Sequence, residues 1–183
     1  MIDLAATILL TALQSATLPE TGCMSPLEIT GFADEQAFVQ TREFAGMDQK
    51  IVSSGSVRIE GETIVWSVFD PILIVTRISG TSITQAIEHG PEEPVGSAGP
   101  ANPLLAQSGL VDLLRGDLQA ASTVYDVEIP DDTLNPWTVA LTPQDADLAT
   151  VIASITISGC RQVEALRVNQ SNGDVIAVSF SDD

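Results

Sequence analysis

Short segments in which apolar and polar residues alternate constrain the fold of this chain more than any other feature. Tyr125, Val127 and Ile129 alternate with Asp126 and Glu128. The same alternation recurs in three later segments, at 137–141, 155–158 and 176–180. A period of two places successive side chains on opposite faces of a strand. These segments therefore predict an antiparallel sheet that is buried on one face and wetted on the other.

The first half of the chain carries similar strand signals, separated by turn residues. Strands are predicted over Ala37–Phe44, Ile51–Ile59, Ile64–Phe69, Ile72–Ile78 and Ser82–Ile87. The breaks are marked by Gly46, Glu60-Gly61-Glu62, Pro71 and Gly80. An Asn172-Gly173 hairpin signal precedes the last strand, and the whole chain contains about ten candidate strands. This pattern predicts a mainly β fold with short helices, in which an incomplete antiparallel β-barrel, or curved sheet, is covered by a helical lid.

One apolar segment in the middle of the chain is predicted to be helical. A loop rich in Pro and Gly, from His89 to Pro103, precedes it, and Asn102-Pro103 has the pattern of an N-cap followed by a first helical residue. Gly116 is a natural end for the helix. This segment is our candidate lid, with a plain core helix as the alternative. Its apolar residues are Leu104, Leu105, Leu110, Val111, Leu113 and Leu114.

The charge balance narrows the possible partners. The 183 residues include 25 Asp or Glu and 7 Lys or Arg, for a formal net charge of −18. Nucleic acids and anionic membrane surfaces would both repel such a chain. We therefore expect no nucleic-acid partner, and we expect a soluble monomer.

The sequence contains no recognisable catalytic or metal-binding pattern. It has one histidine and two cysteines, and it lacks a Cys-x-x-Cys pair, a phosphate-binding loop and a Gly-x-Ser-x-Gly elbow. An acid–base pair is conceivable among Asp131, Asp132, Asp145 and Asp147, but these carboxylates lie where such groups usually cap turns. His89 has no evident orienting partner. We expect no enzymatic activity, no metal and no cofactor.

The N-terminus has the character of an export signal. Leu4–Leu13 is an apolar stretch of signal-peptide length that is too short to span a bilayer. We predict a signal peptide over residues 1–16 and a single domain over 17–183, with an N-terminal core helix as the alternative. In an exported chain, Cys23 and Cys160 are candidates for a disulfide. Two buried free thiols and lipid attachment at Cys23 are the alternatives.

The order and spacing of several short motifs resemble the LolA-type carriers of outer-membrane lipoproteins. In the first half, these motifs are Phe38-x-Gln40-Thr41, Ser54-Gly55-x-Val57, Ile64-x-Trp66 and Asp70-Pro71. In the second half, they are Trp137-x-Val139-x-Leu141-Thr142-Pro143, Ile155-x-Ile157 and Gly173-Asp174-x-Ile176-x-x-x-Phe180. Members of that family carry a basic residue before the tryptophan strand that ties the lid to the barrel. This sequence has Glu60-Gly61-Glu62 in that region, so the usual latch is missing.

The resemblance implies a periplasmic, non-enzymatic carrier. Such a carrier shields the acyl chains of lipoproteins, or of a related lipid, in an apolar cavity during transfer to the outer membrane. Its partners would be an inner-membrane donor protein and an outer-membrane acceptor protein. Carriage of a glycolipid or fatty acyl group, and a solid β-rich interaction domain without a cavity, are the alternatives. The candidate cavity residues are Ile64, Trp66, Val68, Ile72, Ile74 and Ile78.

Overall fold

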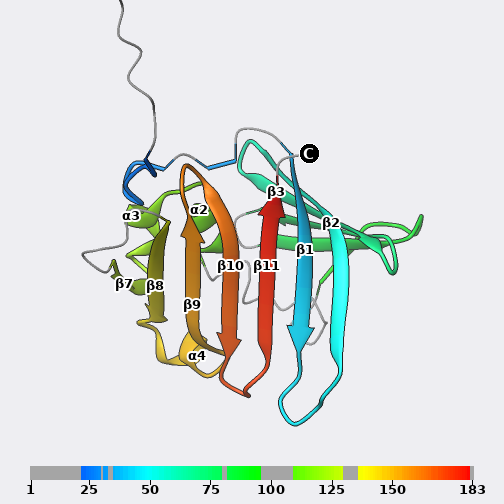
Figure 1. Ribbon diagram of the computed structural model, residues 1–183. Helices are drawn as coiled ribbons and strands as arrows, with labels where there is room; N and C mark the ends of the chain where they lie inside the picture. Colours follow the sequence, from blue (N-terminus) through cyan, green and yellow to red (C-terminus); the bar gives the residue numbers. More distant parts are fainter. Residues whose placement is uncertain are drawn as a thin grey trace, which may run out of the picture.

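One curved antiparallel sheet forms most of the molecule. The computed structural model describes residues 22–29, 31–32, 35–79, 82–95, 109–129 and 136–181. Within them, eleven strands lie in the order β6-β5-β4-β3-β2-β1-β11-β10-β9-β8-β7 (Figure 1). The first and last long strands, β1 and β11, are neighbours at the centre of the sheet. The two edge strands are β6 and β7, which do not pair with each other, so the barrel stays open. The predicted fold class, an incomplete antiparallel β-barrel with short helices, is confirmed.

The strands of the first half follow the predicted segments closely. They are β1 (Gln36–Glu43), β2 (Lys50–Glu60), β3 (Thr63–Asp70), β4 (Ile74–Ser79), β5 (Ser82–Ile87) and the short β6 (Glu93–Pro94). The sequence pattern missed β6, which lies within the segment predicted to be a loop. The predicted start of the fourth strand at Ile72 is wrong, because residues 71–73 form the connection to β4. Pro71 has no N–H to donate to a strand ladder.

The strands of the second half bear out the alternating pattern. They are β7 (Tyr125–Glu128), β8 (Trp137–Pro143), β9 (Ile152–Gly159), β10 (Val163–Gln170) and β11 (Val175–Ser181). Tyr125 is buried, whereas Asp126 and Glu128 on the opposite face of β7 are exposed. Gly173 has a φ of +90° in the turn between β10 and β11, a conformation that favours glycine. The hairpin signal at Asn172-Gly173 is therefore confirmed.

Three short helices are described: α2 (Leu110–Leu114), α3 (Leu118–Ala121) and α4 (Ala146–Ala149). The helix predicted in the middle of the chain is present as α2, while Leu104 and Leu105 lie outside the described residues. Gly116 ends α2 as predicted, with a φ of +74°. A Cβ at this position would approach the Ile29 carbonyl oxygen to 2.7 Å, so the helix end packs tightly against the N-terminal segment. None of these helices is long and apolar enough to cross a membrane.

Aspartates begin the two helices that the sequence pattern missed. The Asp117 carboxylate accepts a hydrogen bond from the Ala120 N–H at 2.8 Å at the start of α3. The Asp145 carboxylate accepts from the N–H groups of Asp147 and Leu148, each at 2.9 Å, at the start of α4. Both helices are too short to show a helical period, so only their caps give a local signal. The expectation that Asp145 serves as a cap is confirmed.

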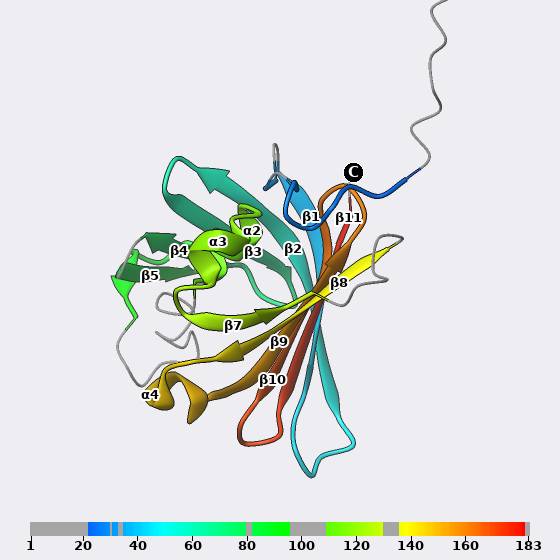
Figure 2. The ribbon, with the colours of Figure 1, turned by 90° about the vertical axis from the view of Figure 1, so that its left-hand side faces the viewer.

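The helices α2 and α3 lie inside the curve of the sheet, between β3–β4 on one side and β7 on the other (Figure 2). The hydrophobic core fills the space between these helices and the concave face. The N-terminal segment contributes Ile29 and Phe32 to this core. It is held there by a disulfide between Cys23 and Cys160 and by a hydrogen bond from the Met24 N–H to the Cys160 carbonyl at 3.0 Å. The predicted signal peptide over residues 1–16 lies outside the described residues.

Candidate functional site: the concave face of the sheet

The strand register brings five of the six predicted cavity residues onto one face. Residues directly opposite each other in an antiparallel pair direct their side chains to the same side of the sheet. In β3 and β4 the opposing pairs are Ile64 with Ile78, Trp66 with Thr76, and Val68 with Ile74. Ile64 and Ile78 belong to the buried core, so this is the concave face. The sixth residue, Ile72, precedes β4 and is 48% exposed, so it is not a strand residue of this face.

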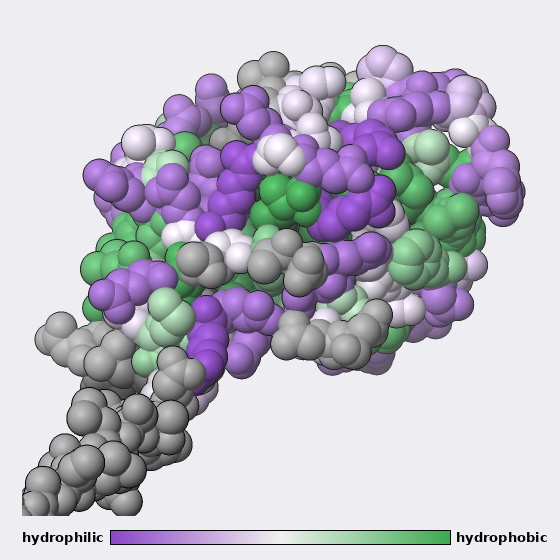
Figure 3. Space-filling model, turned by 90° about the horizontal axis from the view of Figure 1, so that it is seen from above, coloured by the Kyte–Doolittle hydropathy of each residue, from purple (hydrophilic) through white to green (hydrophobic). Residues whose placement is uncertain are grey.

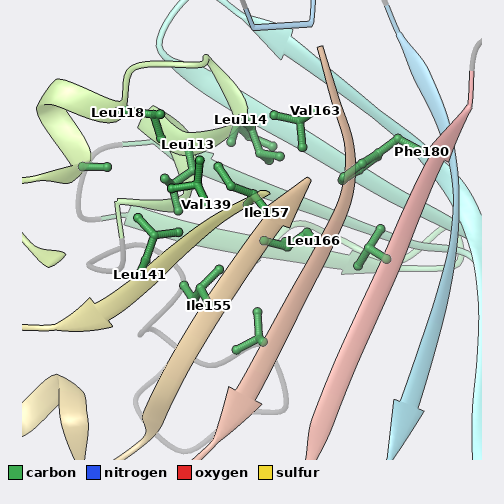
Figure 4. Close-up of a cluster of buried hydrophobic side chains, with 14 of the residues drawn as sticks. Leu113, Leu114, Leu118, Val139, Leu141, Ile155, Ile157, Val163, Leu166 and Phe180 are labelled. Carbon is green, nitrogen blue, oxygen red and sulfur yellow. The ribbon is translucent and has the colours of Figure 1, made fainter. Parts of the chain in front are cut away.

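One part of the concave face is completely buried. We call it the covered region, and it consists of five side chains that are each at most 1% exposed: Trp137, Val139, Leu141, Ile155 and Ile157. Leu113, Leu114 and Leu118 of α2 and α3 point toward this region (Figure 4). Burying each large aliphatic side chain contributes about 1.5–3 kcal/mol to stability. Leu113 and Leu114, which the sequence assigned to a lid, are thus buried against this region.

Another part of the same face is much less covered. We call it the open region, and it consists of Val68, Ile74 and Ile87 on the adjacent strands β3, β4 and β5. Ile74 pairs with both Val68 and Ile87, so the three residues form one row. Val68 and Ile74 are half-buried, and Ile87 is 56% exposed. This row leaves apolar surface available to a ligand.

Exposed apolar side chains continue from the open region around one end of the sheet. The turns β1–β2 and β3–β4 and the end of β5 all lie at this end, because consecutive strands are antiparallel. We call this set the apolar rim: Met47, Ile51, Val52, Phe69, Ile72 and Ile87. Figure 3 views the molecule from above, from the side opposite the β1–β2 turn, and there the surface is mostly hydrophilic with separate hydrophobic patches. Clustered exposed apolar residues of this kind mark interaction sites more often than scattered ones do.

An aromatic cluster lies between the covered and open regions. The ring centroids of Phe38 and Trp66 are 4.4 Å apart, and those of Trp66 and Phe180 are 6.2 Å apart. Phe38 lies opposite Gly55 in β2. A Cβ at Gly55 would come within 1.8 Å of the Ser67 carbonyl oxygen, so this position is restricted to glycine. Trp66 is only half-buried and can therefore contact both the core and a ligand in the open region.

The concave face also carries neutral polar side chains. The Gln40 amide donates to the Ser53 hydroxyl at 3.4 Å, and the Gln85 amide donates to the Thr76 hydroxyl at 3.1 Å. Ser53 and Thr76 are buried, so their polarity is accommodated by these hydrogen bonds. On the concave face of β1–β5, the apolar pair of Val68 and Ile74 thus lies between two sets of polar side chains.

A carboxylate fixes the end of β1 to the turn between β10 and β11. The Asp174 carboxylate accepts a hydrogen bond from the Ala45 N–H at 2.9 Å and pairs with the Arg42 guanidinium at 3.4 Å. The hydrogen bond from Ala45 is the main reason why the pKa of Asp174 is lowered, with smaller contributions from Asn172 and Arg42. Partial burial acts in the opposite direction. Asp174 is therefore a carboxylate held in its ionised form.

A cation at the end of α2 ties this helix to the β2–β3 turn. Arg115, the C-cap of α2, donates a hydrogen bond from Nη2 to the Gly61 carbonyl. Its backbone packs against Gly31, where a Cβ would lie 2.3 Å from the Arg115 Cα. The sequence placed Glu60-Gly61-Glu62 where a basic latch residue was expected. The structure has a basic contact at this turn after all, but the arginine comes from the helix rather than from the sheet.

The candidates for catalysis do not assemble into a site within the described chain. Asp145 caps α4, His89 is exposed, and Asp131 and Asp132 lie outside the described residues. Over the described residues, no group of three or more His, Cys, Asp or Glu side chains is arranged to hold a metal ion.

Sequence reasoning overlooked residues that complete this face. Arg42, Gln40 and Ser53 are brought together by the β1–β2 pairing, and Arg115 reaches a turn 54 residues away. The period of two in β1 was a usable signal, because it places Arg42 on the same face as Phe38. For Arg115 there was no signal, since its partner is a backbone carbonyl.

Comparisons with known proteins give structural neighbours only. No protein-family model matches the chain, and no curated protein matches it. Among solved structures, it is similar to a LolA superfamily protein from Nitrosomonas europaea at 11% identity, over 86% of this chain and 88% of that chain, with a TM-score of 0.49. It is also similar to an outer membrane lipoprotein-sorting protein domain from Vibrio parahaemolyticus at 8% identity, over 81% and 84% of the two chains, with a TM-score of 0.40. The first neighbour bears the family name that the sequence motifs suggested.

Proposed function

We propose that this chain is a non-enzymatic carrier of acyl chains. Its cargo is a lipoprotein or a related acylated lipid, which it shields during transfer through the periplasm to the outer membrane. An inner-membrane donor protein would load it, and an outer-membrane acceptor protein would unload it. The observation that carries the proposal is the contrast on the concave face: a sealed covered region lies beside an open apolar row that ends in the apolar rim.

The energetics of lipid transfer require such a surface. An acyl chain in water costs about 0.8 kcal/mol for each exposed CH₂ group. Free diffusion of a molecule with two or three acyl chains is therefore negligible. The open region and Trp66 offer apolar contact that is already in place, while the covered region keeps the sheet folded without cargo. A solid β-domain would instead cover both parts of the face equally.

The disulfide supports a location outside the cytoplasm. Bonds of this kind form and persist in oxidising compartments such as the bacterial periplasm. Cys23 lies shortly after the predicted signal peptide, and its bond to Cys160 ties the start of the mature chain to the end of β9. The acidic surface would also keep the carrier from adsorbing to anionic membranes between its two partners.

The experiment compares lipid capture by two matched variants. Ile87 in the open region is 56% exposed, and Val39 on the convex face is 51% exposed. Both substitutions, Ile87→Glu and Val39→Glu, add one charge at a half-exposed apolar position. The proteins are exported to a bacterial periplasm, purified and analysed by native mass spectrometry and lipid extraction. We expect bound lipid in the wild type and in Val39→Glu, and a strong loss in Ile87→Glu.

The outcomes separate the alternative functions. A clean protein mass in all three samples, with no uptake of an apolar dye, would leave a β-rich interaction domain without cargo. Extraction of a glycolipid or a free fatty acid would keep the carrier and replace lipoprotein as its cargo. Equal loss of lipid in both variants would show that the concave face is not the binding surface.

A further inference from the structure

One cationic side chain on the concave face has a buried donor without a partner. Arg42 lies on β1 with the same side-chain direction as Phe38 and Gln40. Its Nη2 pairs with Asp174 at 3.4 Å, and its guanidinium lies 4.8 Å from the centroid of the Phe44 ring. Its Nε is buried and has no hydrogen-bond partner among the described residues. A buried donor left unpaired costs about 1–3 kcal/mol, so a ligand that supplies an acceptor would gain from it.

Neutral donors share the concave face with Arg42. Gln40 is two residues away on the same face of β1, and it bonds across the strands to Ser53. Ile51 lies opposite Arg42 in β2, and Ile176 lies opposite it in β11. The donors are therefore set among apolar residues, next to the apolar rim. An acyl chain lying along the open region would have its polar end within this neighbourhood.

The charge balance indicates which acceptor fits. Asp174 already neutralises Arg42, and its own pKa is lowered, so the pair carries no net charge at neutral pH. An incoming carboxylate or phosphate would be attracted by Arg42 and repelled by Asp174. A neutral carbonyl oxygen accepts a hydrogen bond without that repulsion.

We propose that Arg42, with Gln40 and Ser53, forms a subsite for the ester or amide carbonyl that joins an acyl chain to its cargo. This inference rests on the proposed carrier function and deepens it, because it names the chemical class of the cargo. The ligand is an acyl chain in ester or amide linkage, in contrast to a free fatty acid. The linkage carbonyl binds at the rim, and the hydrocarbon lies on Val68 and Ile74.

The test uses three fluorescent probes that differ only at the polar end: pyrene-dodecanoic acid, its methyl ester and dodecylpyrene. Affinities are measured by titration with the whole disulfide-bonded protein. One added hydrogen bond predicts that the wild type binds the ester about three- to tenfold more tightly than the hydrocarbon. In Arg42→Met, this preference disappears while the affinity for dodecylpyrene is unchanged. Arg167→Met, which removes an exposed arginine from the other face of the sheet, keeps the preference.

A conservative variant guards against a merely structural effect. Arg42→Lys retains a cation for Asp174 and lacks the Nε donor, so it should keep wild-type stability and lose the ester preference. Retention of the preference in both Arg42 variants would overturn the subsite, and so would tighter binding of the carboxylate through Arg42. Failure of all three probes to bind the wild type would instead refute the carrier function itself, so the two failures are distinguishable.

Discussion

The covered and open regions are built from similar residues on the same face of one sheet, yet their environments differ completely. Ile157 in the covered region is fully buried, whereas Ile87 in the open region is 56% exposed. The two regions differ in which segments of the chain cover them. The helices α2 and α3, the disulfide-bonded N-terminal segment and Leu148 of α4 all add to the core beside β8 and β9. A strand sequence thus supplies an apolar face, and the connections decide whether that face becomes core or a binding surface.

The largest expected effect comes from removing the disulfide that closes the covered region. Cross-linking positions 137 residues apart should contribute about 5 kcal/mol in the chain-entropy model. The double variant Cys23→Ser/Cys160→Ser should lose about that much unfolding free energy in urea denaturation. At low denaturant, amide exchange should rise first in β8 and β9, because Cys160 also accepts hydrogen bonds from Trp137 and Met24. An equal rise in β3–β5 would contradict the division into two regions.

Truncating one isoleucine in each region measures the contrast directly. Ile157→Ala should cost about 3 kcal/mol of unfolding free energy, because it leaves a cavity in a sealed core. Ile74→Ala should cost less than about 1.5 kcal/mol, because its side chain is only half-buried. Both values come from chemical denaturation of the cargo-free protein. Similar costs would mean that the open region is core as well.

The contact between Arg115 and Gly61 tests how firmly the helices are held on the sheet. Arg115→Met removes a hydrogen bond from a charged donor at a partly exposed site, and we expect a loss of about 1 kcal/mol. We also expect a dye bound in the open region to exchange faster in stopped-flow displacement, because loosened helices leave the concave face beside them more accessible. Arg167→Met is the control for lost charge. A variant with unchanged stability and unchanged exchange would show that this contact does not hold the helices.

The smallest expected effect is a pH dependence at the junction between the two halves of the sheet. The pKa of Asp174 is lowered in the folded protein, chiefly by the Ala45 hydrogen bond, so its stabilisation is fully present above the ordinary value of 3.8. That stabilisation is lost as the pH falls through the lowered folded-state value. Asp174→Asn should therefore be less stable than the wild type at neutral pH and closer to it in acid. The measurement is thermal unfolding of both proteins at several pH values. A stability difference that stays the same at every pH would refute the prediction.

The strand pattern and its turns could be predicted from the sequence because they depend on neighbouring residues. The alternation in β7 and β8, the turn at Gly173 and the end of α2 at Gly116 all follow from local backbone geometry. The helices α3 and α4 and the strand β6 escaped prediction because each is too short to show a period. The predicted strand start at Ile72 failed because apolar character alone does not distinguish a strand from the connection beside it.

The sequence by itself determined that this chain is an acidic, mainly β protein with one apolar face, since those properties are composition and period. Only the tertiary structure decided which part of that face is sealed and which is open. It also decided that Arg42 meets Asp174 across 132 residues and that Cys23 meets Cys160. The pairing of Arg42 with Asp174 depends on β1 lying beside β11 at the centre of the sheet. The packing of the whole chain determines which strands become neighbours, because no local sequence pattern specifies which distant residue will be the partner.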